Sequence, residues 1–149
     1  MAQPVTFNGS KLYIQIGDGA TPTEVFTAPC GLTSRGITFT KDTNDTTVPD
    51  CDDPDLPAWT ERSVSALSWE ATGSGVLAAA ALPTWWDAFN STESVNVRIG
   101  IDAPPADNGG YWAGSAHLTS FNPSGELGDK VQVAVTFSSD GAVTWVDAV

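Results

Sequence analysis

Apolar and polar residues alternate along several strand-length stretches, and this alternation restricts the possible folds more than any other feature of the chain. It runs through "KLYIQI" (residues 11–16), "VNVRIGID" (residues 95–102) and "KVQVAVTF" (residues 130–137). A period of two places the apolar side chains of a strand on one face of a sheet. Because such faces are buried against one another, the alternation predicts a mainly β domain. We expect two packed sheets, as in a β-sandwich, or a partly closed barrel.

Two further stretches near the C-terminus complete the predicted strands. "GYWAGSAHLTSF" (residues 110–121) is strand-like, and its glycines indicate a bulge or a close approach of the backbone to another group. "GAVTWV" (residues 141–146) follows "KVQVAVTF" after a short polar segment. We expect these last two strands to form a hairpin, with Asp140 and Gly141 supplying the turn.

One segment departs from the alternation. Residues 78–91 carry apolar side chains at helical spacing, which predicts one short flanking α-helix. Thr84 is a candidate N-cap for this helix. Trp85, Trp86 and Phe89 are expected to form one apolar stripe that packs on the sheet.

A long irregular segment separates two of the predicted strands. "KDTNDTTVPDCDDPDLPAWT" (residues 41–60) contains three prolines and is long for a passive connection. Loops of this length are commonly functional, or become ordered when a partner binds. We therefore treat residues 41–62 as a long inter-strand loop that contacts another molecule.

Length and charge exclude several classes of protein. The chain of 149 residues is expected to form a single domain, residues 1–149. It has 18 acidic and 6 basic residues, a net charge of −12, so it repels nucleic-acid backbones and acidic membrane surfaces. No apolar run is long enough to span a bilayer, and no signal peptide is apparent, so we expect synthesis and retention in the cytoplasm. The two cysteines, Cys30 and Cys51, are expected to be reduced.

The acidic loop has the composition of a metal site but lacks the required spacing. Asp50, Asp52 and Asp55, with Glu61 further on, resemble the ligands of a calcium-binding EF-hand loop. Pro54 occupies the fifth position of that loop, and the glycine required at the sixth is missing. We therefore predict no metal and no cofactor, while a looser calcium site remains an alternative.

The chain contains few of the residues that catalysis requires but several aromatic residues that could bind carbohydrate. His117 is the only histidine, and no nucleophile elbow surrounds it, so we predict no catalytic residues and no enzyme. A minor enzymatic alternative would be centred on His117. Aromatic side chains in or beside strands can stack on sugar rings. The main alternative function is therefore a monomeric β-sandwich module that binds carbohydrate or a calcium-dependent ligand. Its candidate aromatic residues are Trp59, Trp69, Trp112 and Trp145.

The order of these segments is similar to that of a known family. A strand enters the long loop in "GITFTKDTNDTTVPDCDD" (residues 36–53), and "GSGVL" (residues 73–77) precedes the helix. "WAGSAHLTSF" (residues 112–121) and "VTFSSDGAVTW" (residues 135–145) follow it. Over most of its length the chain resembles the tail tube, or major tail, proteins of long-tailed bacteriophages.

The resemblance implies a fold, an assembly and a location. Members form a β-sandwich flanked by a helix, and six copies join their sheets into a ring. The rings stack into a hollow virion tail tube for DNA ejection, assembled in the bacterial cytoplasm. The partners implied are further copies of the chain, the tape measure, tail terminator and distal tail proteins, and DNA as a transient cargo, with no membrane. The uncharged faces of the strands could line a wet channel, and the net charge predicts an acidic lumen.

The resemblance also assigns roles to particular residues. The N-terminal arm, residues 1–10, and the loop at residues 41–62 would reach neighbouring subunits. Leu56 and Trp59 are the expected apolar anchors of this loop. Its other candidate contact residues are Asp50, Asp52, Asp53, Asp55 and Arg62. The possible cross-subunit cations are Lys11, Arg35, Arg98 and Lys130.

Overall fold

The computed structural model describes residues 3–19 and 23–149. Its internal contacts group the chain into two units. The larger unit comprises the chain up to Thr38 and from Trp69 onward, and the smaller unit is Phe39–Ser68. Part of the predicted N-terminal arm, residues 1–2, lies outside the described residues.

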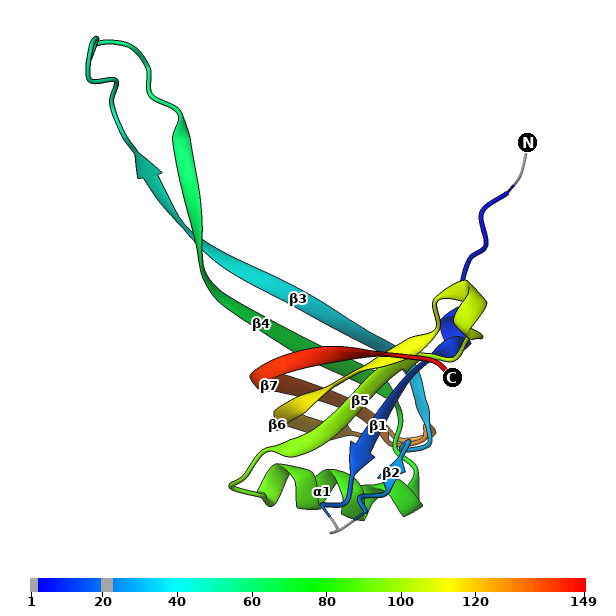
Figure 1. The fold of residues 1–149 in the computed structure, drawn as a ribbon. Coiled ribbons are helices and arrows are strands. Elements are labelled where there is room, and N and C mark those ends of the chain that lie inside the picture. Colours follow the sequence, from blue (N-terminus) through cyan, green and yellow to red (C-terminus); the bar gives the residue numbers. More distant parts are fainter. Residues whose placement is uncertain (1–2, 20–22) are drawn as a thin grey trace. The chain divides into compact units, whose positions relative to one another are not determined.

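The described elements are seven strands, one α-helix and three short 3₁₀ turns (Figure 1). The strands are β1 (Leu12–Gly17), β2 (Phe26–Thr27), β3 (Leu32–Thr47), β4 (Thr60–Val76), β5 (Val95–Ile101), β6 (Gly110–Ser124) and β7 (Gln132–Asp147). The helix α1 is Leu82–Asn90, and the 3₁₀ turns are Gly9–Lys11, Ala79–Ala81 and Pro105–Asp107. The prediction of a mainly β chain with one short helix is confirmed. None of the described helices is long and apolar enough to cross a membrane.

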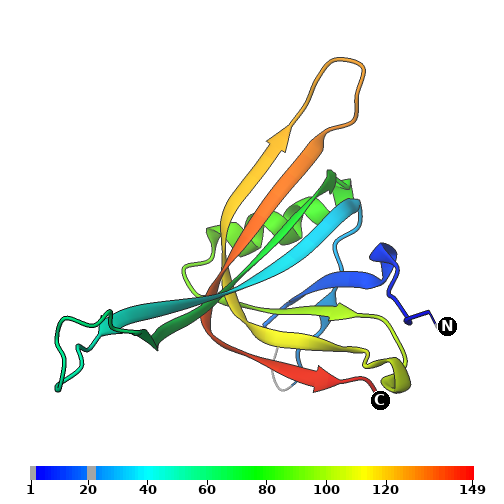
Figure 2. The ribbon, with the colours of Figure 1, turned by 90° about the horizontal axis from the view of Figure 1, so that it is seen from above.

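The strands form one sheet in the order β2-β1-β5-β6-β7-β4-β3. The expectation of two separate sheets is therefore wrong for the described residues, whose single sheet does not close into a barrel. The reason is the length of β6 and β7, which continue from one half of the sheet into the other (Figure 2). Gly110–Ala116 of β6 pairs with β5, whereas residues 132–138 of β7 pair with β4.

Irregularities in β6 and β7 accompany this change of partner. The pairing of the two strands shifts register between Gly114 and Ala116 and again between Leu118 and Ser120. Such bulges bend a strand and increase its twist, in agreement with the glycine signal in the sequence. The predicted C-terminal hairpin is wrong, because β7 passes through Asp140 and Gly141 without reversing.

A single apolar core receives side chains from both halves of the sheet and from α1. The largest fully buried side chains are Trp85, Phe137, Ile14, Ile99, Val97 and Val135. In β7 burial follows the predicted alternation, with every second residue buried over 133–137, and β4 has the same pattern over 69–75. The period-two pattern therefore identified the buried face of β7 correctly.

The helix begins before the predicted cap Thr84, and it buries only part of the apolar stripe expected to pack on the sheet. It begins at Leu82, with proline in its first turn and Ala81 as N-cap, so Thr84 is not the cap. Trp85 is buried and packs against Phe137 of β7, with ring centroids 6.1 Å apart. Trp86 is 52% exposed and Phe89 45% exposed, so the expected packing on the sheet holds for Trp85 alone.

The smaller unit is formed by the outer parts of β3 and β4 and the loop between them. The strands continue to Thr47 and resume at Thr60, so the irregular segment is residues 48–59, shorter than the predicted 41–62. Almost every side chain from Phe39 to Ser68 is exposed. Since the unit has no apolar core of its own, it is held mainly by β pairing and local polar contacts.

Candidate interaction surfaces

The two ends of the sheet are open strand edges. At one end lies β3, which has 16 residues and pairs with β4 alone among the described strands. At the other end β2 pairs with β1 only at Ile16 and Gly17, so within the described residues most of β1 also forms an edge. Exposed edges carry backbone groups that can pair with another chain.

The face of β4, β7 and β6 turned away from the core is polar and almost free of charge. The cross-strand rows are Glu70–Ser138–His117, Thr72–Thr136–Ser120 and Ser74–Ala134–Asn122. These rows contain no lysine or arginine. Alternation therefore places one apolar and one hydrophilic surface on the same three strands, as the sequence predicted.

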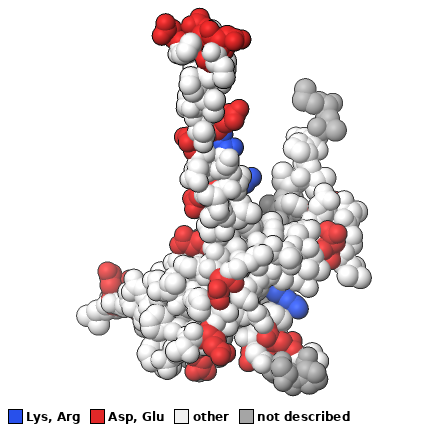
Figure 3. Space-filling view, turned by 60° about the vertical axis from the view of Figure 1, so that its left-hand side comes forward, with Lys and Arg blue, Asp and Glu red and all other residues white. Residues whose placement is uncertain are grey.

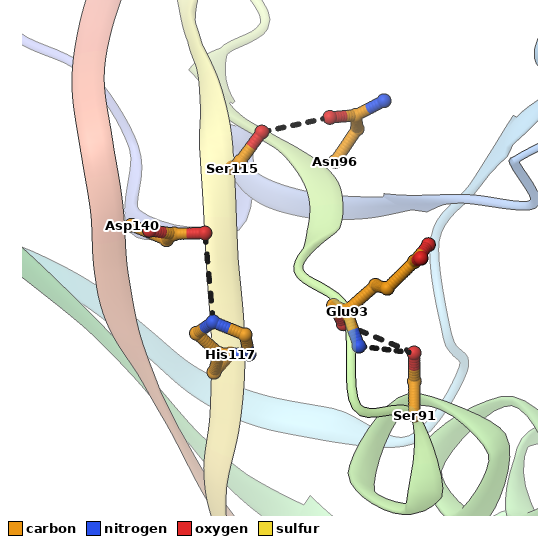
Figure 4. Close-up of polar contacts among 6 residues, drawn as sticks. All are labelled: Ser91, Glu93, Asn96, Ser115, His117 and Asp140. Carbon is orange, nitrogen blue, oxygen red and sulfur yellow. Dashed lines mark hydrogen bonds and ion pairs between the residues drawn. The ribbon is translucent and has the colours of Figure 1, made fainter.

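His117 lies at the charged end of this face. Its Nε2 is 3.5 Å from the Asp140 carboxylate, and both side chains are about half exposed (Figure 4). The hydroxyl of its cross-strand neighbour Ser138 forms a hydrogen bond with the Thr119 hydroxyl, at 3.2 Å. The serine opposite His117 in the sheet therefore forms a hydrogen bond with another hydroxyl, an arrangement that gives no support to a catalytic His117.

The aspartates of the 48–59 loop stabilise its turns. The Asp50 carboxylate accepts a hydrogen bond from the backbone N–H of Asp52, and Asp53 accepts one from the N–H of Asp55. The backbone N–H of Leu56 also bonds the Asp53 carbonyl oxygen, at 3.2 Å. Figure 3 shows acidic side chains gathered at the free end of this unit. Among the described residues, no group of three or more His, Cys, Asp or Glu side chains is placed to hold a metal ion.

The apolar members of the loop are open to solvent. Leu56 is 52% exposed and Trp59 is 92% exposed. The other tryptophans considered for sugar binding lie differently: Trp69 is buried, and Trp112 and Trp145 pack edge to face at 4.7 Å. Trp59 is therefore the tryptophan of this set that offers most of its surface to a partner.

Two of the predicted contact cations have partners within the chain. Arg62 lies 3.0 Å from the carboxylate of Asp45, inside the smaller unit. Lys11 lies 4.0 Å from the carboxylate of Asp102. All four side chains are more than half exposed, so each pair contributes little to stability and could exchange partners.

Arg98 is held by aromatic rings. Its guanidinium lies over the Phe26 ring at 3.8 Å and near the Tyr111 ring at 4.9 Å. No local sequence pattern predicts this stacking, because the three residues come from three separate strands, β2, β5 and β6. Arg35 is half-buried and Lys130 is exposed. Pairing of these cations with loop aspartates of another copy stays a prediction.

One side of α1 carries an exposed apolar surface, although Trp86 and Phe89 were expected to pack on the sheet. Leu82, Trp86 and Phe89 are 43%, 52% and 45% exposed, and the Trp86 and Phe89 rings stack at 6.2 Å. Their spacing of four and then three residues is the signal that could have identified this second stripe. We call these three residues the helix stripe.

Beside α1 lies an acidic pocket. Its carboxylates are Asp18, Glu24, Asp87 and Glu93. The amide of Asn96 donates to both Glu24 carboxylate oxygens. The Ser115 hydroxyl donates in turn to the Asn96 carbonyl oxygen (Figure 4). This chain of hydrogen bonds sets the position of the Glu24 carboxylate.

Comparison with known proteins identifies similar sequences and folds. Residues 6–145 match the family described as phage tail tube protein. No curated protein sequence matches the chain. A chain in the virion of a native gene transfer agent particle has a TM-score of 0.73 and 21% identity, covering 95% of this chain and 99% of that chain.

Two further structures share the fold. A chain from the tail of an empty gene transfer agent particle, refined with C6 symmetry, has a TM-score of 0.71 and 21% identity, covering 95% of this chain and 99% of that chain. A chain of the SPP1 tail tube has a TM-score of 0.67 and 10% identity, covering 97% of this chain and 81% of that chain. At these identities the structural likeness shows the fold.

Proposed function

The chain belongs to the phage tail tube protein family, and on this premise we propose that its copies close into hexameric rings that stack into a hollow tail tube for genome passage. The match over residues 6–145 carries the proposal, since it includes nearly the whole chain. Membership confirms the predicted family and the prediction of a structural protein rather than an enzyme. The hexameric state is drawn from the C6 symmetry of the gene transfer agent tail.

Ring closure would use the two open edges of the sheet. In the proposed ring, β3 of one copy pairs with the exposed part of β1 of the next, so that the sheets form a continuous wall. Because the two edges are different surfaces, this contact is head-to-tail around the ring and can close on itself. Closure would also remove the aggregation risk that long open edges bring to a monomer.

The channel wall would be the polar face of β4, β7 and β6. Its rows of serine, threonine, asparagine and alanine would keep the channel hydrated and offer no cation to a passing phosphate backbone. We place the negative charge of this face at Glu70 and Asp140, near one end of the rows. The proposed lumen is therefore mildly acidic, with a neutral polar stretch, and DNA would pass as cargo.

Stacking of rings would use the 48–59 loop. Leu56 and Trp59 are its candidate apolar anchors, because they expose large apolar side chains beside turns fixed by Asp50 and Asp53. Replacing Trp59 with alanine should leave folding intact, since the side chain is 92% exposed, while tubes shorten or fail to form. Tubes of normal length and yield from this variant would remove Trp59 from the anchors.

The remaining roles follow from a place in the virion tail. The family places the chain in a tail, and we propose assembly in the cytoplasm of the bacterial host. The tape measure, tail terminator and distal tail proteins are the proposed partners inside the tube and at its ends.

Negative-stain microscopy of the concentrated wild-type chain tests the proposed function. The expected result is rings with sixfold symmetry and hollow tubes, together with a large assembly in sedimentation velocity. A chain that stays monomeric at every concentration, with no rings or tubes, would overturn the proposal. As a control, Leu127→Ser changes a fully exposed residue in the β6–β7 connection and should assemble normally.

A further inference from the structure

The helix stripe is an apolar surface that stays exposed among the residues that the structure describes. Trp85 and Ala88 are buried on the side of α1 that packs on the sheet. Leu82, Trp86 and Phe89 project from the other side of the helix. The four-residue step from Leu82 to Trp86 corresponds to a rise of about 6 Å along the helix. An occupant would need apolar side chains with a similar spacing.

The charges near the stripe restrict what can bind there. The one charged residue of α1 is Asp87, and the pocket beside the helix adds Asp18, Glu24 and Glu93. These carboxylates belong to α1 itself or to the pocket that α1 borders, so the surroundings of the stripe are acidic. The 48–59 loop carries four aspartates and would be repelled at this surface.

The N-terminal segment has the opposite character. The first 17 residues contain no carboxylate and one lysine, Lys11. Val5 and Phe7 are 75% and 47% exposed, and residues 3–8 form no helix or strand. Pro4 favours an extended backbone around it, which reduces the entropy lost when the segment is ordered.

The spacing of these apolar residues matches the stripe. In an extended segment Val5 and Phe7 point to the same side and lie about 7 Å apart. This distance is close to the rise of about 6 Å between residues four apart on a helix. The two side chains could therefore contact Leu82 and the stacked aromatic rings together.

Within the larger unit the two surfaces lie at opposite ends of β1. The N-terminal segment leads into Leu12, where β1 begins, while the pocket that borders α1 is lined by Ile16 and Gly17, where β1 ends (Figure 1). Complementary patches at opposite ends of a unit favour head-to-tail contact between copies, which generates an open stack.

We propose that residues 3–8 of one copy dock on the helix stripe of a second copy in the adjacent ring. Val5 and Phe7 would cover Leu82, Trp86 and Phe89, and the absence of carboxylates would avoid repulsion from the acidic pocket. This proposal rests on the proposed tube, and it gives the N-terminal arm a specific receptor surface.

Disulfide trapping between two different chains tests the contact. Cys30 and Cys51 are first replaced by serine; one chain then carries Phe7→Cys and the other Trp86→Cys. After assembly and mild oxidation, the mixed disulfide is identified by mass spectrometry. Docking raises the effective concentration of one thiol at the other, so the yield should exceed that of a Phe7→Cys and Leu127→Cys pair by at least about tenfold.

The outcomes separate this proposal from the proposed function. If wild-type tubes form but the trapped yield equals the control, the docking is overturned and the tube stands. If no ring or tube forms from the wild-type chain, both are overturned. A Trp59→Cys chain that traps Trp86→Cys in place of Phe7→Cys would assign the stripe to the acidic loop and overturn the docking.

An assembly measurement checks the same contact without cysteines. Phe7→Ser should raise the protein concentration needed for tube formation by about tenfold, which corresponds to about 1.4 kcal/mol. Leu127→Ser is the matched control, since it also exchanges an exposed apolar residue for serine. Equal threshold concentrations for the two variants would contradict the proposal.

Discussion

Replacing Trp85 with alanine is expected to lower the free energy of unfolding by a large amount, because this side chain is fully buried in the core. Trp85 is 1% exposed and packs against Phe137, at the point where α1 covers the sheet. Truncating a buried tryptophan loses its transfer free energy and leaves a cavity, so we expect a loss of about 4 kcal/mol in the free energy of unfolding. In a chain of this length that corresponds to a decrease in Tm of about 8–16 °C.

The neighbouring residue provides a matched control. Trp86 has the same side chain in the same helix, but 52% of it is exposed. About half of its roughly 200 Å² already contacts water, so truncation should cost about 2 kcal/mol and create no closed cavity. The assay is urea unfolding of each variant, followed by circular dichroism, at a concentration where the chain is monomeric.

The comparison tests the direction in which the helix faces. We expect the Trp85→Ala variant to be less stable than Trp86→Ala by at least about 2 kcal/mol. Equal losses, or a larger loss for Trp86→Ala, would refute the assignment of Trp85 to the core and of Trp86 to the exposed stripe.

Three further predictions concern a close backbone approach, a titrating phenol and a surface ion pair. A Cβ at Gly75 would lie 2.6 Å from the Thr33 backbone nitrogen, so Gly75→Ala should destabilise the fold by about 2 kcal/mol or more. At Gly36 the nearest atom to an added Cβ is 3.8 Å away, so the control variant Gly36→Ala should be almost neutral. Thermal melts of the two variants check this difference. Burial, followed by nearby negative charge, raises the pKa of Tyr13 above its ordinary value. The neutral phenol of Tyr13 is therefore favoured in the folded state. Its contribution to the free energy of unfolding is complete below about pH 10 and is lost as pH rises through the folded-state pKa. Unfolding measurements above pH 10 should show a shallower loss of stability for Tyr13→Phe, and identical pH profiles would contradict this reasoning. Arg62→Gln removes an exposed ion pair and should change the free energy of unfolding by less than about 1 kcal/mol in urea titrations.

Local patterns predicted the elements and the faces of several strands. Alternation in "KVQVAVTF" correctly placed Val133, Val135 and Phe137 in the core, because a pleated strand turns successive side chains to opposite faces. The helix was also predicted from its spacing. The side of α1 that packs on the sheet was not predicted, because apolar residues occupy two sides of the helix. Only the packing decides that Trp85 is buried and Trp86 is exposed.

The sequence predicted some of the candidate surfaces but not others. The exposed Leu56 and Trp59 lie in the loop that the sequence singled out, although their contacts with another copy stay predictions. The stacking of Arg98 on Phe26 and Tyr111 joins residues from separate strands, so no local pattern could reveal it. The helix stripe could have been read from its spacing, but nothing in the sequence says that the sheet would cover the other side of α1.

The sequence by itself determined a mainly β chain, its one helix, its acidic loop and its family, because each depends on local periodicity, composition or the order of segments. Only the tertiary structure decided that the strands form one sheet. Alternation determines which face a residue occupies, but not which strands lie side by side or how far they continue. The continuity of β7 through Gly141 shows this: a dipeptide typical of a hairpin turn lies inside a long bent strand, because pairing with β6 extends on both sides of it.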